Sequence, residues 1–120
     1  MGPWLVDIYD RSELEAWLAG GPSGGRASVV MVVRGDGTAV REFLPNALDA
    51  AKRHSRRVVV WVKDSAIFKE SESVSLFGEG DGVLAAVMGA GGTAGGWVTR
   101  DRLGVEDADF AFAAAEEARV

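Results

Sequence analysis

Cysteine is absent from this chain of 120 residues. Without thiols the protein has no disulfide, no thiolate metal site, no cysteine nucleophile and no Cys-x-x-Cys redox pair. Its single histidine, His54, also excludes a metal site built from several histidines. The carboxylates do not follow the spaced pattern of a calcium-binding loop. We therefore expect no metal and no cofactor.

Long apolar runs and an excess of positive charge are also missing. Apolar runs such as 29–33 and 83–88 are far shorter than the roughly 20 residues of a membrane-spanning helix. The N-terminus has no basic segment followed by an apolar stretch, the pattern of a secretory signal. With 18 acidic and 13 basic side chains the net charge is −5, whereas nucleic-acid binders normally present a basic face. We expect a soluble, cytoplasmic protein that binds neither membrane nor nucleic acid.

The chain does have enough apolar material for one core. Hydrophobic residues make up 48% of the sequence, and this length is typical of a single domain that folds without disulfides or metals. No linker or internal repeat divides it, so we expect residues 1–120 to form one domain. Arginine outnumbers lysine ten to three, a bias typical of GC-rich genomes such as those of actinobacteria and their phages.

Stretches typical of strands alternate with stretches typical of helices. Continuous apolar segments indicate strands that are buried on both faces, and apolar residues at helical spacing indicate helices with one buried side. The expected elements, in chain order, cover 5–9, 13–19, 28–33, 39–54, 57–63, 70–77, 83–88, 97–100 and 105–119. Their order is β-α-β-α-β-(α)-β-β-α. It predicts an α/β fold with a mixed sheet of four or five strands, parallel in its first half and antiparallel in its closing hairpin.

Local signals set some of the expected boundaries. Ser12 is a plausible N-cap for the first helix, because Glu15 follows it at the spacing of a capping box. Pro45 lies inside the second helical pattern, where a proline removes a backbone donor and should kink or restart the helix. Residues 64–82 have the least regular pattern, and a short helix over 70–77 is the preferred interpretation.

The order of elements and several segments resemble the thioredoxin-like superfamily. Residues 10–18 look like that family's first helix, 29–33 like its central strand and Pro45 like the proline of its long second helix. Residues 52–60 look like the exit from that helix into the third strand, and 73–87 like the short helix, loop and fourth strand. The resemblance covers nearly the whole chain. It implies a three-layer α/β/α fold in which a βαβ half and a ββα half are joined by a helix.

Two departures from that family bear on function. Its redox motif should follow the central strand, where this chain has Arg34-Gly35-Asp36-Gly37-Thr38. Its cis-proline loop should precede the fourth strand, where this chain has Gly80-Asp81-Gly82. Thiol–disulfide exchange needs an attacking thiolate and a resolving thiol. The resemblance therefore implies a redox-inactive member.

The same resemblance implies a binding edge. In such a fold the two loops and the glycine-rich turn near Gly91 would share one edge, where relatives hold peptides or small thiols. Glycines let a partner backbone approach closely, and Trp97 is a candidate partner-facing aromatic. The candidate binding residues are Arg34, Gly35, Asp36, Gly37, Thr38, Gly80, Asp81, Gly82, Gly91, Gly92 and Trp97. The predicted function is a non-catalytic adaptor that binds another protein or peptide, with its oligomeric state open.

Two other classes of function remain as alternatives. The first is a small α/β domain that binds an anion or nucleotide at residues 34–38, because a junction between a strand and a helix presents free backbone N–H groups. The dinucleotide fingerprint is incomplete there, since Val40 stands where the third glycine is needed. The second is a structural or assembly protein of an actinobacterial phage.

One basic cluster stands out in this acidic chain. It consists of Lys52, Arg53, Arg56 and Arg57, with His54 among them. Such a cluster is able to contact phosphate or an acidic partner. Cations also favour the C-terminal end of a helix dipole, and a solvated helix end is the simpler interpretation.

Overall fold

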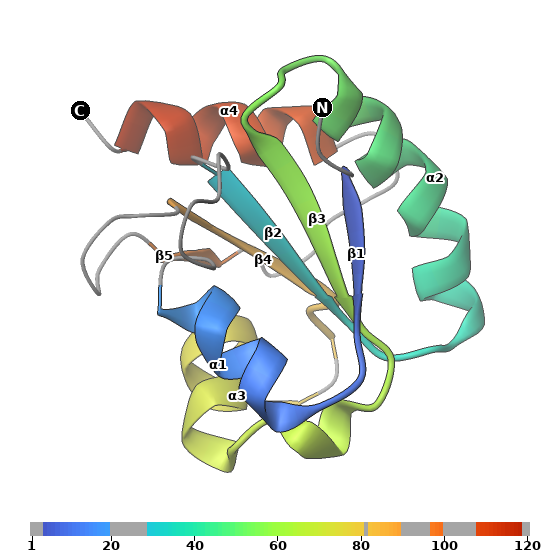
Figure 1. The fold of residues 1–120 in the computed structure, drawn as a ribbon, viewed down its shortest axis with the longest axis vertical. Helices are drawn as coiled ribbons and strands as arrows, with labels where there is room; N and C mark the ends of the chain where they lie inside the picture. Colours follow the sequence, from blue (N-terminus) through green and yellow to red (C-terminus); the bar gives the residue numbers. More distant parts are fainter. Residues whose placement is uncertain (1–3, 20–28, 81, 90–96, 100–107, 119–120) are drawn as a thin grey trace.

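A five-stranded mixed sheet forms the centre of the protein, with the strands in the order β1-β3-β2-β4-β5 (Figure 1). The computed structural model describes residues 4–19, 29–80, 82–89, 97–99 and 108–118. The strands are β1 (Leu5–Ile8), β2 (Val29–Arg34), β3 (Arg57–Val62), β4 (Ala85–Gly89) and β5 (Trp97–Thr99). β1, β3 and β2 are parallel, and β4 is antiparallel to both of its neighbours. The predicted α/β class with a mixed sheet is confirmed.

Helices cover both faces of this sheet. α2 and α4 lie against one face, and α1 and α3 lie against the other (Figure 1). The helical segments in the described part of the chain are α1 (Arg11–Leu18), α2 (Thr38–Lys52), the short 3-10 helix η1 (Ser65–Ile67), α3 (Glu70–Phe77) and α4 (Ala108–Ala118). None of these described helices combines the length and apolarity that a bilayer crossing requires.

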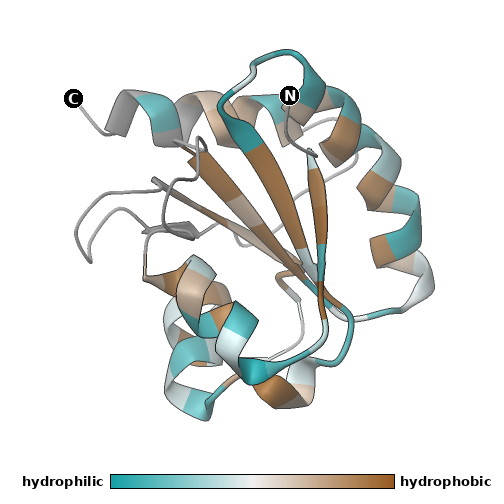
Figure 2. Ribbon diagram, in the orientation of Figure 1, coloured by the Kyte–Doolittle hydropathy of each residue, from teal (hydrophilic) through white to brown (hydrophobic). Residues whose placement is uncertain are grey.

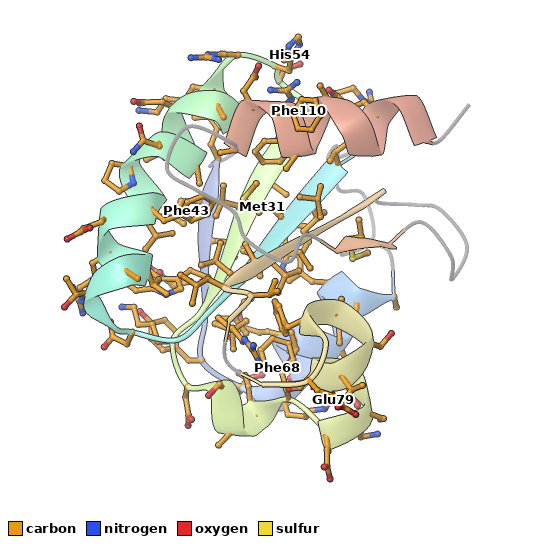
Figure 3. All side chains as sticks on the ribbon, turned by 180° about the vertical axis from the view of Figure 1, so that it is seen from behind. Met31, Phe43, His54, Phe68, Glu79 and Phe110 are labelled. Carbon is orange, nitrogen blue, oxygen red and sulfur yellow. The ribbon has the colours of Figure 1, made fainter. Side chains whose placement is uncertain are left out.

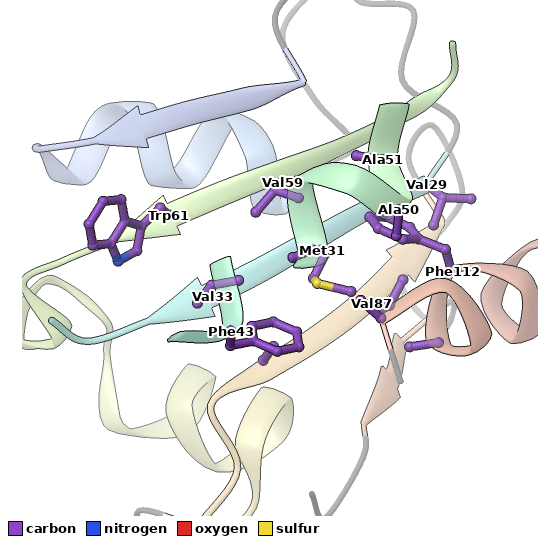
Figure 4. Close-up of a cluster of buried hydrophobic side chains, with 14 of the residues drawn as sticks. Val29, Met31, Val33, Phe43, Ala50, Ala51, Val59, Trp61, Val87 and Phe112 are labelled. Atoms are coloured by element: carbon purple, nitrogen blue, oxygen red, sulfur yellow. The ribbon is translucent and has the colours of Figure 1, made fainter. Parts of the chain in front are cut away.

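The continuous apolar strands reflect a sheet that is buried on both sides. Side chains alternate between the two faces of a strand, so Met31 packs with Phe43 of α2 and Phe112 of α4 (Figure 4). Its neighbour Val30 packs on the other face, in the cluster that contains Phe77 of α3. The hydropathy colouring shows the same division, with apolar strands inside and hydrophilic residues on the outer helix surfaces (Figure 2).

The start of α1 differs from the prediction. Asp10, not Ser12, is the N-cap: its Oδ1 accepts the Glu13 N–H at 2.9 Å and the Ser12 hydroxyl at 2.8 Å. These hydrogen bonds, the one from the Glu13 N–H first, lower the pKa of Asp10. Glu15 does not reach back to close a capping box with Ser12, since its carboxylate pairs with Arg11 at 3.2 Å.

Two further expectations concern α2 and the segment that follows β3. α2 is one continuous helix through Pro45, so the helix does not restart there. It ends at Lys52, two residues before the expected end at His54. The short helix expected over 70–77 is confirmed as α3, and η1 precedes it.

An ion pair fixes α3 beside α1. Arg11 Nη2 donates to Glu72 Oε2 at 2.6 Å, and Arg11 Nη1 donates to the carbonyl of Ile67 at 3.0 Å. The hydrogen bond from Arg11 lowers the pKa of Glu72. The contact is made in the first turn of α3, and the helix ends at Phe77, before the loop that leads to β4.

Candidate functional site

The end of β2 and the segment before β4 are joined by one side chain. Arg34 Nε donates to the carbonyl of Val83 at 3.0 Å, and its Nη2 donates to the carbonyl of Gly80 at 2.9 Å. Its main-chain N–H donates to the carbonyl of Leu84 at 2.9 Å. The guanidinium lies 4.3 Å from the centre of the Phe77 ring. The structure thus brings together Arg34 and the loop at Gly80, which were predicted to share an edge.

Residues 34–38, which join the end of β2 to the start of α2 and which we call the turn 34–38, are attached to β3. Gly35 has φ +95°, a conformation that favours glycine. Its N–H donates to the carbonyl of Val62 at 2.8 Å, and its carbonyl accepts the Trp61 Nε1–H at 2.8 Å. Gly37 is the N-cap of α2, and no side chain caps that helix end. The first residue of α2, Thr38, is exposed.

Charged side chains contact aromatic side chains beside this turn. Asp36 Oδ1 accepts a hydrogen bond from Arg41 Nη2 at 2.6 Å. Arg41 lies 5.7 Å from the ring centre of Trp61, and Lys63 lies 4.4 Å from it. Lys63 also lies 5.5 Å from the ring of Tyr9, which is 66% exposed. The sequence analysis named Asp36 as a candidate but not Arg41, Trp61, Lys63 or Tyr9. Lys63 directly follows the apolar segment of β3, and this position is the signal that could have identified it.

Residues 82–84, which we call the extended stretch, lie between α3 and β4. Gly82 is exposed, and a Cβ added to it would meet no atom within 4 Å. Its φ lies outside the left-handed region. The N–H groups of Gly82 and Val83 donate to no described residue. Main-chain donors of this kind are what an extended peptide uses when it pairs with the edge of a sheet.

Part of the predicted site lies outside the described residues. Asp81, Gly91 and Gly92 belong to this part. Trp97 begins β5, where it pairs with Met88 of β4. The described part of the candidate edge is therefore the turn 34–38, Gly80 and the extended stretch.

Arg34 is a positioning residue at this edge, because its guanidinium holds the carbonyls of Gly80 and Val83. Replacing it by methionine retains apolar contact with Phe77 but removes the hydrogen bonds to the carbonyls of Gly80 and Val83. We expect the free energy of unfolding to fall by about 1–2 kcal/mol. We also expect faster hydrogen exchange at the main-chain N–H of residue 34, which donates to the carbonyl of Leu84, with unchanged exchange in α4; NMR measures both. Unchanged exchange at residue 34 would contradict this role.

Among the described residues, the candidate site offers main-chain donors. In the part of the chain that the structure describes, no three histidine, aspartate or glutamate side chains are placed to hold a metal ion. No protein-family model matches this chain, and neither does any curated protein or solved structure. What the edge offers a ligand is the exposed Gly82, the main chain of the extended stretch and the uncapped start of α2.

Proposed function

We propose that this protein is a thioredoxin-like binding module without thiol chemistry. It holds an extended segment of another protein along residues 82–84, beside the turn 34–38. The extended stretch carries this proposal, because Arg34 fixes it while its Gly82 and Val83 N–H groups donate to no described residue. A bound segment would accept a hydrogen bond from one of these two groups, because the N–H groups of successive residues in an extended chain point in opposite directions, as in the addition of a strand to a sheet.

The order of elements supports the thioredoxin-like part of the proposal. A parallel half containing β1, α1, β2, α2 and β3 is followed by α3 and then by an antiparallel half containing β4, β5 and α4. That family has a βαβ half, a connecting helix and a ββα half. Under this resemblance, residues 34–38 correspond to the redox motif and residues 80–82 to the cis-proline loop. Because the chain has no cysteine, this edge cannot carry out thiol–disulfide exchange. Binding is the function of the family that it could still perform.

The anion-binding alternative has less support at this edge. The guanidinium of Arg34 is directed to the carbonyls of Gly80 and Val83. Arg41 is paired with Asp36, whose carboxylate lies one residue before the N-cap of α2 and would repel an anion there. A strand-pairing ligand needs neither cation.

Replacing Gly82 by leucine tests the proposal. A peptide is first selected from a displayed library on the wild-type protein. The leucine side chain should block approach to the extended stretch and weaken that peptide's binding at least about tenfold, a loss of about 1.4 kcal/mol. The fold should tolerate the change, because a Cβ at this position meets no atom within 4 Å. Fluorescence anisotropy measures the affinity and thermal unfolding checks the fold.

The matched control adds the same side chain elsewhere. Asn46, exposed on α2, is replaced by leucine and should leave the affinity unchanged. Equal affinity for wild type and the Gly82 variant would contradict the proposal, as would NMR shift changes confined to residues away from 34–38 and 80–84. Stabilisation by inorganic phosphate or nucleotides, with no peptide selected, would instead support the anion-binding alternative.

A further inference from the structure

The connection between α2 and β3 is a second concentration of charge. Lys52, Arg53, His54 and Arg56 are all exposed there, and we call residues 52–56 the basic turn. β3 runs from Arg57, next to the basic turn, to Val62, whose carbonyl binds Gly35 at the candidate site. The two surfaces therefore lie at opposite ends of the sheet (Figure 1).

Neither ion pairs nor the helix dipole neutralise all of the positive side chains in this connection. Arg57 is buried, and its guanidinium is neutralised by Asp109 at 2.6 Å and Glu116 at 2.7 Å. Arg53 shares Asp109 at 3.4 Å, whereas Lys52, His54 and Arg56 form no ion pair with any residue that the structure describes. The helix dipole acts within the last turn of a helix. Lys52 is the last residue of α2, so Arg56 lies beyond that range.

An exposed aromatic side chain lies at the same end of the molecule as the basic turn (Figure 3). Phe110 of α4 is 61% exposed, while its neighbours Ala111 and Phe112 are buried. The preceding residue, Asp109, is the one that contacts Arg53. His54 and Phe110 lie at the same end of the molecule in Figure 3. Aromatic residues and arginines are enriched in protein–protein interfaces.

We propose that the basic turn and Phe110 form a second docking surface, which binds an acidic segment of a partner protein that also carries apolar side chains. The charge distribution favours this occupant. The protein has a net charge of −5 and measures about 30 Å across, whereas electrostatic attraction is screened over about 8 Å at physiological salt. A short acidic segment is confined to the basic turn and Phe110, where the carboxylate of Asp109 is already bound to Arg53 and Arg57. A nucleic acid or an anionic membrane extends beyond it and meets the protein's own carboxylates.

This second surface goes beyond the function proposed above. A module that binds one protein at the extended stretch and another at the basic turn would hold two partners at opposite ends of the sheet. The two surfaces share no residue, so each is tested separately.

A synthetic peptide of glutamate and leucine residues, labelled with fluorescein, is the probe. Its affinity is measured by anisotropy at low and at physiological salt. Replacing Arg56 by glutamine should weaken binding about threefold at low salt, and replacing Lys52 as well should bring the loss to about tenfold. Replacing Phe110 by serine should weaken binding about tenfold without changing the salt dependence. Thermal unfolding checks that each variant remains folded at the temperature of the binding measurement.

The matched control removes one positive charge at the other end of the molecule. Lys69 to glutamine changes the net charge as the Arg56 variant does, and it should leave the affinity unchanged. An equal loss with Lys69→Gln would mean that net charge alone attracts the probe, and it would overturn the proposal. Unchanged affinity in the Lys52 and Arg56 double variant would also overturn it. A single-stranded oligonucleotide or a phosphatidylserine vesicle that binds through the same residues more tightly than the peptide would do the same.

Discussion

Alanine in place of Trp61 is expected to lower the free energy of unfolding by about 4 kcal/mol. The indole is only 8% exposed and packs in the core cluster between the sheet and α2. Its loss leaves a cavity and also removes the Nε1–H donor to the carbonyl of Gly35. Urea unfolding followed by circular dichroism measures the change. A loss below about 1 kcal/mol, the effect of an ordinary surface substitution, would contradict this role.

Phenylalanine at the same position separates the two contributions. It keeps an aromatic ring in the core but cannot donate to the carbonyl of Gly35, and we expect a loss of about 1–2 kcal/mol. The Gly35 amide, bonded to the carbonyl of Val62, should then exchange its hydrogen faster than in wild type. A variant as stable as wild type, with unchanged exchange at Gly35, would show that packing alone accounts for Trp61.

The strands could be predicted from the sequence because burial on both faces leaves a local pattern. Residues 29–33 and 57–62 are apolar at almost every position, and both segments lie in the middle of the sheet. The helix after Lys69 could also be predicted, from the few apolar residues of that segment, Val74, Leu76 and Phe77. The last two are buried in the structure. The α/β class follows from the alternation of these segments.

The role of Arg34 could not be predicted in the same way. The sequence placed it at a binding edge, but its guanidinium bonds to the carbonyl of Gly80, 46 residues further along the chain. The contact of Trp61 with Gly35 likewise depends on the register of β2 with β3, which pairs Val33 with Trp61. The residues next to these positions in the sequence show no pattern that would predict either contact.

The N-cap of α1 was mispredicted for a similar reason. Asp10 and Ser12 both suit an N-cap, and Glu15 gave Ser12 the spacing of a capping box. In the fold, Arg11 belongs to the first turn of α1 and bonds to Glu72 of α3. The helix thus starts earlier than predicted, and its first turn makes a contact with α3. The spacing of residues within 10–18 carries no information about that contact.

Methionine in place of Arg57 is expected to lower the free energy of unfolding by about 3 kcal/mol and the unfolding temperature by about 10 °C. Arg57 is 4% exposed, bonds to Asp109, Glu116 and the carbonyl of Ala50, and lies over the ring of Phe112. It therefore connects β3 and α2 to α4. Urea and thermal unfolding measure the loss. The control is Arg53→Gln, an exposed partner of the same Asp109, which should change stability by less than about 1 kcal/mol.

The pH dependence identifies how much of this stabilisation is ionic. The hydrogen bond from Arg57 lowers the pKa of Asp109. A carboxyl group whose pKa is lower in the folded state stabilises the fold above its unfolded pKa, and that contribution is lost as the pH falls through the folded value. The stability difference between wild type and Arg57→Met should thus be constant from about pH 7 to pH 5 and shrink below about pH 4. A difference that persists undiminished in stronger acid would assign the stabilisation to the packing on Phe112 and the bond to Ala50 instead.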